Sequence, residues 1–137
     1  MKEKQTLFDI TVNILERIRE VLTTLYFDAE AGLSGNEDVG QMSAWYILSS
    51  LGFYEVEPAG GRYWFGTPLF DKVEVDVPAG VFTVVADNNS AENKYIQRVW
   101  LNGKPYDKAW IAHSDIMAGG ELRFEMGSEP KCWYEVK

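Results

Sequence analysis

Apolar residues in the first 28 positions recur with a helical period. Between about Thr6 and Asp28 they are spaced three or four residues apart, which places them along one stripe of an α-helix. The members of this stripe are Ile10, Ile14, Ile18, Val21, Leu22 and Leu25. The opposite side holds polar residues, among them Glu16 and Arg17, which we expect to be solvated. The pattern predicts an amphipathic helix near residues 6–28.

A second helix is predicted near residues 37–52. Asn36 is a suitable N-cap, and Glu37 and Asp38 place negative charge at the positive end of the helix dipole. Gly52 is a natural C-terminal stop. Residues 41–51 are apolar or small almost all round, which is typical of a helix buried among other helices. Two helices are too few to cover it, so we expect helices from a partner chain or from a longer protein. Without them, the exposed helix face should drive self-association.

After Phe53 the period changes from 3.6 to 2 residues. Alternating runs cover residues 73–77, 81–86, 96–101 and 121–126. Turn-forming segments separate them, with Asn102-Gly103 the clearest hairpin. The predicted fold class is therefore α+β: two antiparallel helices in residues 1–56, followed by an antiparallel β-sandwich in residues 57–137.

Charge and composition narrow the classes of binding partner that we expect. The net charge is −8, the pI is about 4.6, and Lys and Arg are scattered singly, so a nucleic-acid partner is not expected. No apolar run is long enough to span a bilayer, and the first residues do not read as a signal peptide. The single cysteine, Cys132, cannot form an internal disulfide. The aromatic content of 14% fits either a β-rich core or sugar binding, and composition alone favours the core.

The segment Gly32–Tyr46 holds two adjacent carboxylates, Glu37 and Asp38, at a glycine-flanked helix start. Acidic residues at such a position ordinarily cap the helix. Gly35 and Gly40, however, allow a close approach that capping does not need, and the helix that follows reads as interior. Carboxylates held there are candidates for binding a hard cation or for activating a water.

This segment resembles glycoside hydrolase family 92, and the resemblance continues in order along the chain. Further matching stretches are Leu51–Tyr54, Tyr63–Phe70, Tyr95–Gln97, Leu101–Gly103, His113–Ile116 and Gly119–Gly127. In the family these stretches fall at the C-terminal end of a chain about five times longer. The resemblance implies an inverting, calcium-dependent exo-α-mannosidase, secreted or periplasmic, built from a β-sandwich and an (α/α)6 barrel. Its helical part here would be the end of that barrel.

The resemblance also implies roles for three residues. Asp38 would be the general base, and Asn36, where the family often has a second acid, would orient the attacking water. Glu37 would be a calcium ligand or a contact to the sugar. The catalytic acid of the family lies upstream and matches no residue here, so the isolated chain should be inactive. The implied substrate is a mannose-containing glycan, with an α-1,2 linkage expected.

The alternative is a non-catalytic β-sandwich that binds carbohydrate or stabilises a neighbour. Four tryptophans could form a sugar platform, but their scattered spacing favours the core: Trp64, Trp100, Trp110 and Trp133. Trp45 and Tyr46 are the aromatics expected nearest Asp38. The only histidine, His113, is interpreted as a turn residue, and Cys132 as a buried or idle thiol.

Overall fold

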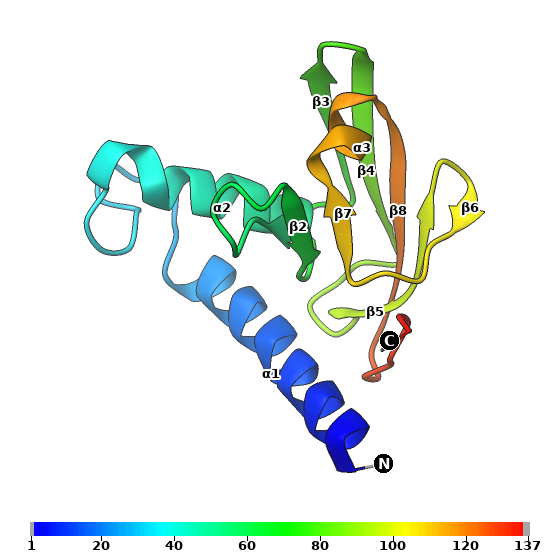
Figure 1. Ribbon diagram of the computed structural model, residues 1–137. Coiled ribbons are helices and arrows are strands. Elements are labelled where there is room, and N and C mark those ends of the chain that lie inside the picture. Colours follow the sequence, from blue (N-terminus) through cyan, green and yellow to red (C-terminus); the bar gives the residue numbers. More distant parts are fainter. Residues whose placement is uncertain (1, 136–137) are drawn as a thin grey trace.

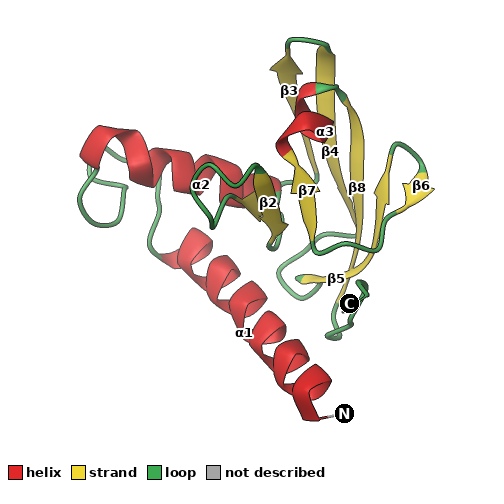
Figure 2. Ribbon diagram, in the orientation of Figure 1, coloured by secondary structure: helices red, strands yellow, loops and turns green. Residues whose placement is uncertain are grey.

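The computed structural model describes residues 2–135. It is an α+β fold in which two helices precede two sheets (Figures 1 and 2). The helical part comprises α1 (Lys2–Thr24), the 3-10 turn η1 (Asp38–Gly40) and α2 (Gln41–Leu51). The strands and the short helix α3 follow: β1 (Phe53–Tyr54), β2 (Arg62–Phe65), β3 (Lys72–Val77), β4 (Gly80–Asp87), β5 (Tyr95–Leu101), β6 (Lys104–Pro105), β7 (Trp110–Ala112), α3 (His113–Met117) and β8 (Gly120–Gly127).

The strands form a three-stranded sheet in the order β1-β2-β7 and a five-stranded sheet in the order β3-β4-β8-β5-β6. The expectation of purely antiparallel sheets is wrong for one pair, because β8 runs parallel to β4. After β5 the chain passes through β6, β7 and α3 before β8 enters between β4 and β5. A connection of that length is long enough for a parallel crossover. The predicted hairpin at Asn102-Gly103 is confirmed, since it joins β5 to β6.

One hydrophobic core joins the two sheets. The side chains of Phe82, Leu122 and Phe124 from the large sheet are completely buried, as is Ile111 of β7. Phe65 of β2 meets Phe124 edge to face, with ring centroids 5.2 Å apart. Alternate residues of β4 and β8 point inward, which is the period-2 pattern of the sequence. Fully burying each such side chain contributes about 1.5–3 kcal/mol.

The buried face of α1 differs from the predicted stripe. Leu15 and Leu22 are each 2% exposed, whereas Ile10, Ile14 and Leu25 are 47–50% exposed. The segment has two neighbouring apolar rows on one helix, and periodicity alone could not show which of them meets the sheets. The row that contains Ile10, Ile14 and Leu25 therefore stays at the surface.

Polar contacts tie α1 to the large-sheet side. The Arg19 guanidinium donates to the Thr67 hydroxyl at 3.0 Å, to the Pro68 carbonyl at 2.8 Å and to the Asn89 side-chain oxygen at 2.8 Å. Burial lowers the pKa of Arg19. The Tyr95 hydroxyl donates a short hydrogen bond to Glu16. Both contacts bridge segments far apart in the sequence, so they orient α1.

Helix α2 is fully buried only at its C-terminal end. Ser49, Ser50 and Leu51 are buried, whereas Ile47 is 59% exposed. Gly52 ends the helix in a left-handed conformation, as predicted, with its N–H donating to Leu48 and Ser49. A Cβ there would lie 3.2 Å from the Phe124 ring, so the close packing also favours glycine. The face of α2 that holds Ala44 and Ile47 is therefore without cover in the part of the chain that the structure describes.

Candidate functional site

The predicted site residues lie on the loop that joins α1 to α2, at the end of α2 remote from the sheets (Figure 1). The loop is held at its base by backbone hydrogen bonds from Phe27 N to Gly32 O and from Gly32 N to Ala29 O. A side chain at Gly32 would overlap the Phe27 carbonyl, since its Cβ would fall 1.8 Å from that oxygen. This tight turn therefore requires glycine at position 32.

Glu37 caps the start of α2. Its two carboxylate oxygens accept the Ser43 backbone N–H at 3.1 and 3.3 Å. Asn36 is therefore not the N-cap that the sequence suggested: the N-cap of α2 is Gly40, four residues later. The helical path is interrupted because Val39 and Gly40 have positive φ angles of 56° and 78°. A carboxylate from the preceding turn supplies the cap that Gly40 lacks.

Asp38 is the first residue of η1 and is exposed. Within residues 2–135 its carboxylate has no hydrogen bond or ion pair, in contrast to that of Glu37. The next residue, Val39, is fully exposed and left-handed, which is strained for a β-branched side chain. Such strain is found mostly at functional sites, where the rest of the protein maintains it. Asn36 is also exposed, so all three candidates share one open surface.

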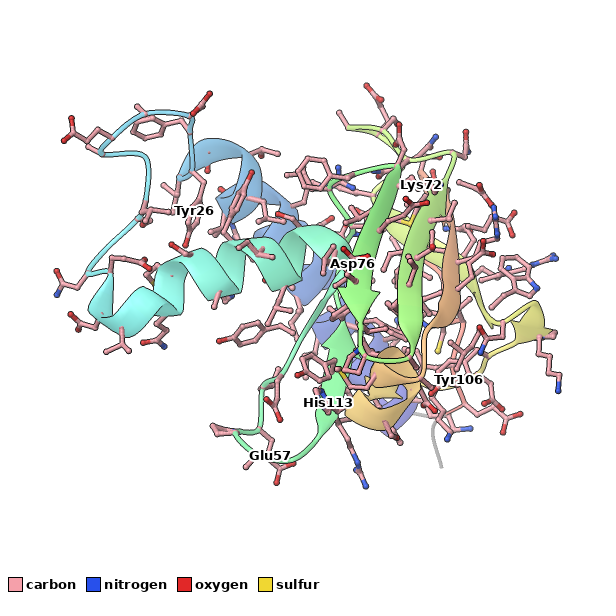
Figure 3. All side chains as sticks on the ribbon, turned by 90° about the horizontal axis from the view of Figure 1, so that it is seen from above. Tyr26, Glu57, Lys72, Asp76, Tyr106 and His113 are labelled. Atoms are coloured by element: carbon pink, nitrogen blue, oxygen red, sulfur yellow. The ribbon has the colours of Figure 1, made fainter. Side chains whose placement is uncertain are left out.

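An aromatic cluster lies beneath this loop. Tyr26 stacks on Trp45 and Tyr46 with centroid separations of 5.5 and 4.9 Å. Figure 3 shows Tyr26 between the loop and α2. Trp45 and Tyr46 were expected near the site; Tyr26 was not, although it follows Leu22 by one helical turn. Burial, and to a lesser degree the Glu37 carboxylate, raises the pKa of Tyr26.

The other candidates lie elsewhere. His113 begins α3, where its ring stacks on Tyr63 and its Nδ1 is 3.3 Å from the Tyr63 hydroxyl (Figure 3). The four tryptophans expected in the core are only partly buried, and one of them, Trp64, counts as exposed. Trp64 lies on β2, the central strand of the small sheet, next to the buried Phe65, so its ring is on the face of that sheet away from the core. Cys132 is exposed and not buried.

No metal centre is formed by this part of the chain. Among residues 2–135 there is no group of three or more His, Cys, Asp or Glu side chains that could hold a metal ion. Calcium takes six to eight oxygen ligands, and Glu37 is already engaged with Ser43. The described residues therefore do not fit a calcium site by themselves. None of the described helices is long and apolar enough to cross a membrane.

Comparison with known proteins identifies the family. The model of the glycosyl hydrolase family 92 catalytic domain matches residues 13–128, which is most of the chain. The chain therefore belongs to glycosyl hydrolase family 92, and the resemblance seen in the sequence is confirmed.

Solved relatives share the fold. An inverting mannosidase of family GH92 from Bacteroides thetaiotaomicron is 40% identical with a TM-score of 0.77; the match covers 85% of this chain and 16% of that one. A GH92 α-mannosidase from the same bacterium is 37% identical with a TM-score of 0.82, covering 90% and 17%. Its complex with mannoimidazole matches with 38% identity and a TM-score of 0.80, covering 85% and 16%.

A curated relative from Arthroderma benhamiae, described as an uncharacterized secreted glycosidase, is 30% identical over 122 residues. The match covers 86% of this chain and 16% of that protein. The chain thus spans about a sixth of the length of the relatives it matches. Residues that complete the active site in those proteins can lie in the other five sixths.

Proposed function

We propose that this chain supplies the general base, Asp38, to an inverting exo-α-mannosidase of family 92. The observation that supports this best is the contrast between two adjacent acids. Glu37 is occupied in capping α2, whereas the Asp38 carboxylate is exposed and without a partner among the described residues. A base must be free to accept a proton from water.

In the proposed reaction the Asp38 carboxylate takes a proton from a water molecule. The water oxygen attacks the anomeric carbon of mannose from the face opposite the glycosidic oxygen, and the bond to that oxygen breaks. An acid outside this chain protonates the leaving oxygen. In inverting enzymes the two carboxyl groups are about 6.5–9.5 Å apart, which leaves room for the water. Asn36, two residues before Asp38, would orient the water through its side-chain amide.

Calcium dependence is part of the proposal for the intact enzyme only. The described residues of this chain, 2–135, do not form a calcium site, so the ligands would come mainly from elsewhere, with Glu37 at most one of them.

The proposed substrate is a mannose-containing glycan with a terminal α-mannosyl residue, α-1,2-linked by expectation. Support comes from two relatives: one is called an α-mannosidase and was solved with mannoimidazole, and the other is called an inverting mannosidase. A secreted or periplasmic location is proposed because the relative from Arthroderma benhamiae is described as secreted.

The test is Asp38→Ala in a full-length enzyme that contains this segment. We expect kcat to fall at least ~100-fold, because a positioned base contributes on that scale. KM should change much less, since the base acts on water in the transition state. Asp28→Ala removes an exposed acid four residues after the end of α1; it is the matched control and should leave both constants unchanged. Near-normal turnover of the Asp38 variant would rule out the base assignment. The isolated 137-residue chain should hydrolyse no mannoside.

A further inference from the structure

The outer face of the five-stranded sheet, away from the hydrophobic core, has a polar row with one tryptophan. Because Phe82, Val84, Leu122 and Phe124 point into the core, their neighbours in sequence point outward. The register places Val85, Arg123 and Trp100 side by side across β4, β8 and β5. The adjacent row contains Asp87, Glu125 and Arg98.

Four of these outward residues, Asp87, Trp100, Arg123 and Glu125, line a hollow of about 460 Å³. Its lining combines one indole ring with a set of planar polar groups: Asp87, Asn88, Trp100, Glu121, Arg123 and Glu125. A volume of this size is within the range of small-ligand sites, which use a few convergent polar groups beside apolar surface. Neither Asp38 nor any other residue of the loop between α1 and α2 contributes to it.

The polar groups hold one another in place. Arg123 Nη1 donates to both oxygens of Asp87 at 2.7 and 2.9 Å, and its Nε donates to Glu121 at 3.0 Å. Arg98 and Glu125 approach to 3.7 Å. Asn88, with a φ of 62°, donates from its side chain to the Met126 carbonyl at 3.3 Å. Side chains that are already ordered lose little further entropy when a ligand binds.

We propose that this hollow is a binding site for a neutral pyranose of an oligosaccharide, separate from the site at Asp38. The Trp100 ring would lie against the apolar face of the sugar, and the carboxylates and guanidinium would exchange bidentate hydrogen bonds with neighbouring hydroxyls. Three carboxylates face two guanidinium groups here, so the charge does not favour an anionic sugar. The proposal does not depend on the proposed function, because no residue is shared.

The test uses the 137-residue chain labelled with ¹⁵N and titrated with mannotriose and, separately, with cellotriose. We expect saturable shifts of the Trp100 indole and Arg123 guanidinium signals. Trp100→Ala should weaken binding at least ~10-fold, as should Glu125→Gln, which keeps the shape of the side chain but removes its charge. Trp64→Ala is the matched control: its ring is 40% exposed but lies on the small sheet, and binding should be unchanged.

Several results would overturn the proposal. They are the absence of saturable shifts with either sugar, shifts centred on Trp64, or equal losses in the Trp64 and Trp100 variants. Should Trp100→Ala fail to fold, the signals of the unsubstituted chain and the Glu125 variant still decide the question. A response to mannotriose alone would narrow the ligand to mannosides, and a response to both would keep the wider class. Asp38→Ala should leave this binding intact, so a failure of the proposed function is visible separately.

Discussion

The two halves of this chain differ in how completely they bury their own apolar side chains. In the sheets, Phe82, Leu122 and Phe124 are fully buried within one core. In the helices, Ile14 and Ile47 remain 50% and 59% exposed. The sheets satisfy their hydrophobic pattern within this chain, whereas the helices do not. An apolar pattern therefore predicts which face of an element is buried in a chain only when the surface that covers this face belongs to the same chain.

The candidate catalytic acid lies in the less covered half. Asp38 and the fully exposed Val39 belong to η1, directly before α2. This end of α2 is the one remote from the sheets (Figure 1). The matched relatives have about six times this length of chain. Self-association through the exposed face of α2 stays a prediction, for which sedimentation at micromolar concentration is the measurement.

The largest expected loss of stability comes from a substitution in the core of the sheets, which we compare with a substitution in the helices. Phe124→Ala should lower the free energy of unfolding by about 3–5 kcal/mol, because it removes a buried ring and leaves a cavity. Ile14→Ala should cost less than about 1 kcal/mol, since half of that side chain is already exposed. Urea unfolding monitored by circular dichroism measures both. Equal losses would contradict the division into a packed and an uncovered half.

A smaller loss of stability is expected when a contact between the helices and the sheets is removed. Arg19→Met should cost about 2 kcal/mol, because Thr67, Pro68 and Asn89 lose a shared donor and Thr67 is fully buried. Arg17→Met is the control: Arg17 pairs with Glu20 on the exposed side and should contribute less than about 0.5 kcal/mol. Hydrogen exchange of the α1 amides should accelerate only in the Arg19 variant. Unchanged protection would mean that Arg19 does not hold α1.

The second tie between the halves should depend on pH. The hydrogen bond to Glu16, followed by burial, raises the pKa of Tyr95 to about 12, compared with 10 for a free tyrosine. A raised pKa in the folded state means that the stabilisation is complete below pH 10 and is lost as the pH rises from 10 to 12. Tyr95→Phe should cost about 1–2 kcal/mol at neutral pH and flatten this decline. A decline of the same size in the variant would assign it to other groups.

The sequence predicted the large sheet better than the small one. The four alternating runs correspond to β3, β4, β5 and β8 because each buries one face in the core. All three strands of the small sheet, β1, β2 and β7, were missed, since two to four residues are too few to show a period. The parallel pairing of β4 and β8 was also missed, because alternation is the same in either strand direction.

The sequence indicated which residues form the candidate site, but not how these residues are arranged in space. The adjacent acids and flanking glycines indicated the loop, and the structure shows that Glu37 caps the helix while the Asp38 carboxylate has no partner among the described residues. The left-handed Val39 could not be predicted, because a β-branched residue ordinarily avoids that conformation. The role of Asp38 still rests on the test described for the full-length enzyme.

The smallest expected effect is a gain of stability from a substitution in the helical half. The Tyr26 hydroxyl is buried and has no hydrogen-bond partner among the described residues, although its ring stacks on Trp45 and Tyr46. A buried hydroxyl without a partner costs free energy in the folded state. Tyr26→Phe keeps the ring and removes that cost, so it should raise the free energy of unfolding by about 1 kcal/mol.

The matched control for Tyr26→Phe is Tyr46→Phe, whose hydroxyl is not among the buried atoms without a partner. It should change the free energy of unfolding by less than about 0.5 kcal/mol, the usual range for substitutions away from such features. Urea unfolding of both variants provides the comparison. A loss of stability in Tyr26→Phe would mean that a bound water satisfies the hydroxyl. The Tyr26 hydroxyl, beneath the loop that holds Asp38, would then have a hydrogen-bond partner. The helical half would differ from the sheets only in the exposure of its apolar side chains.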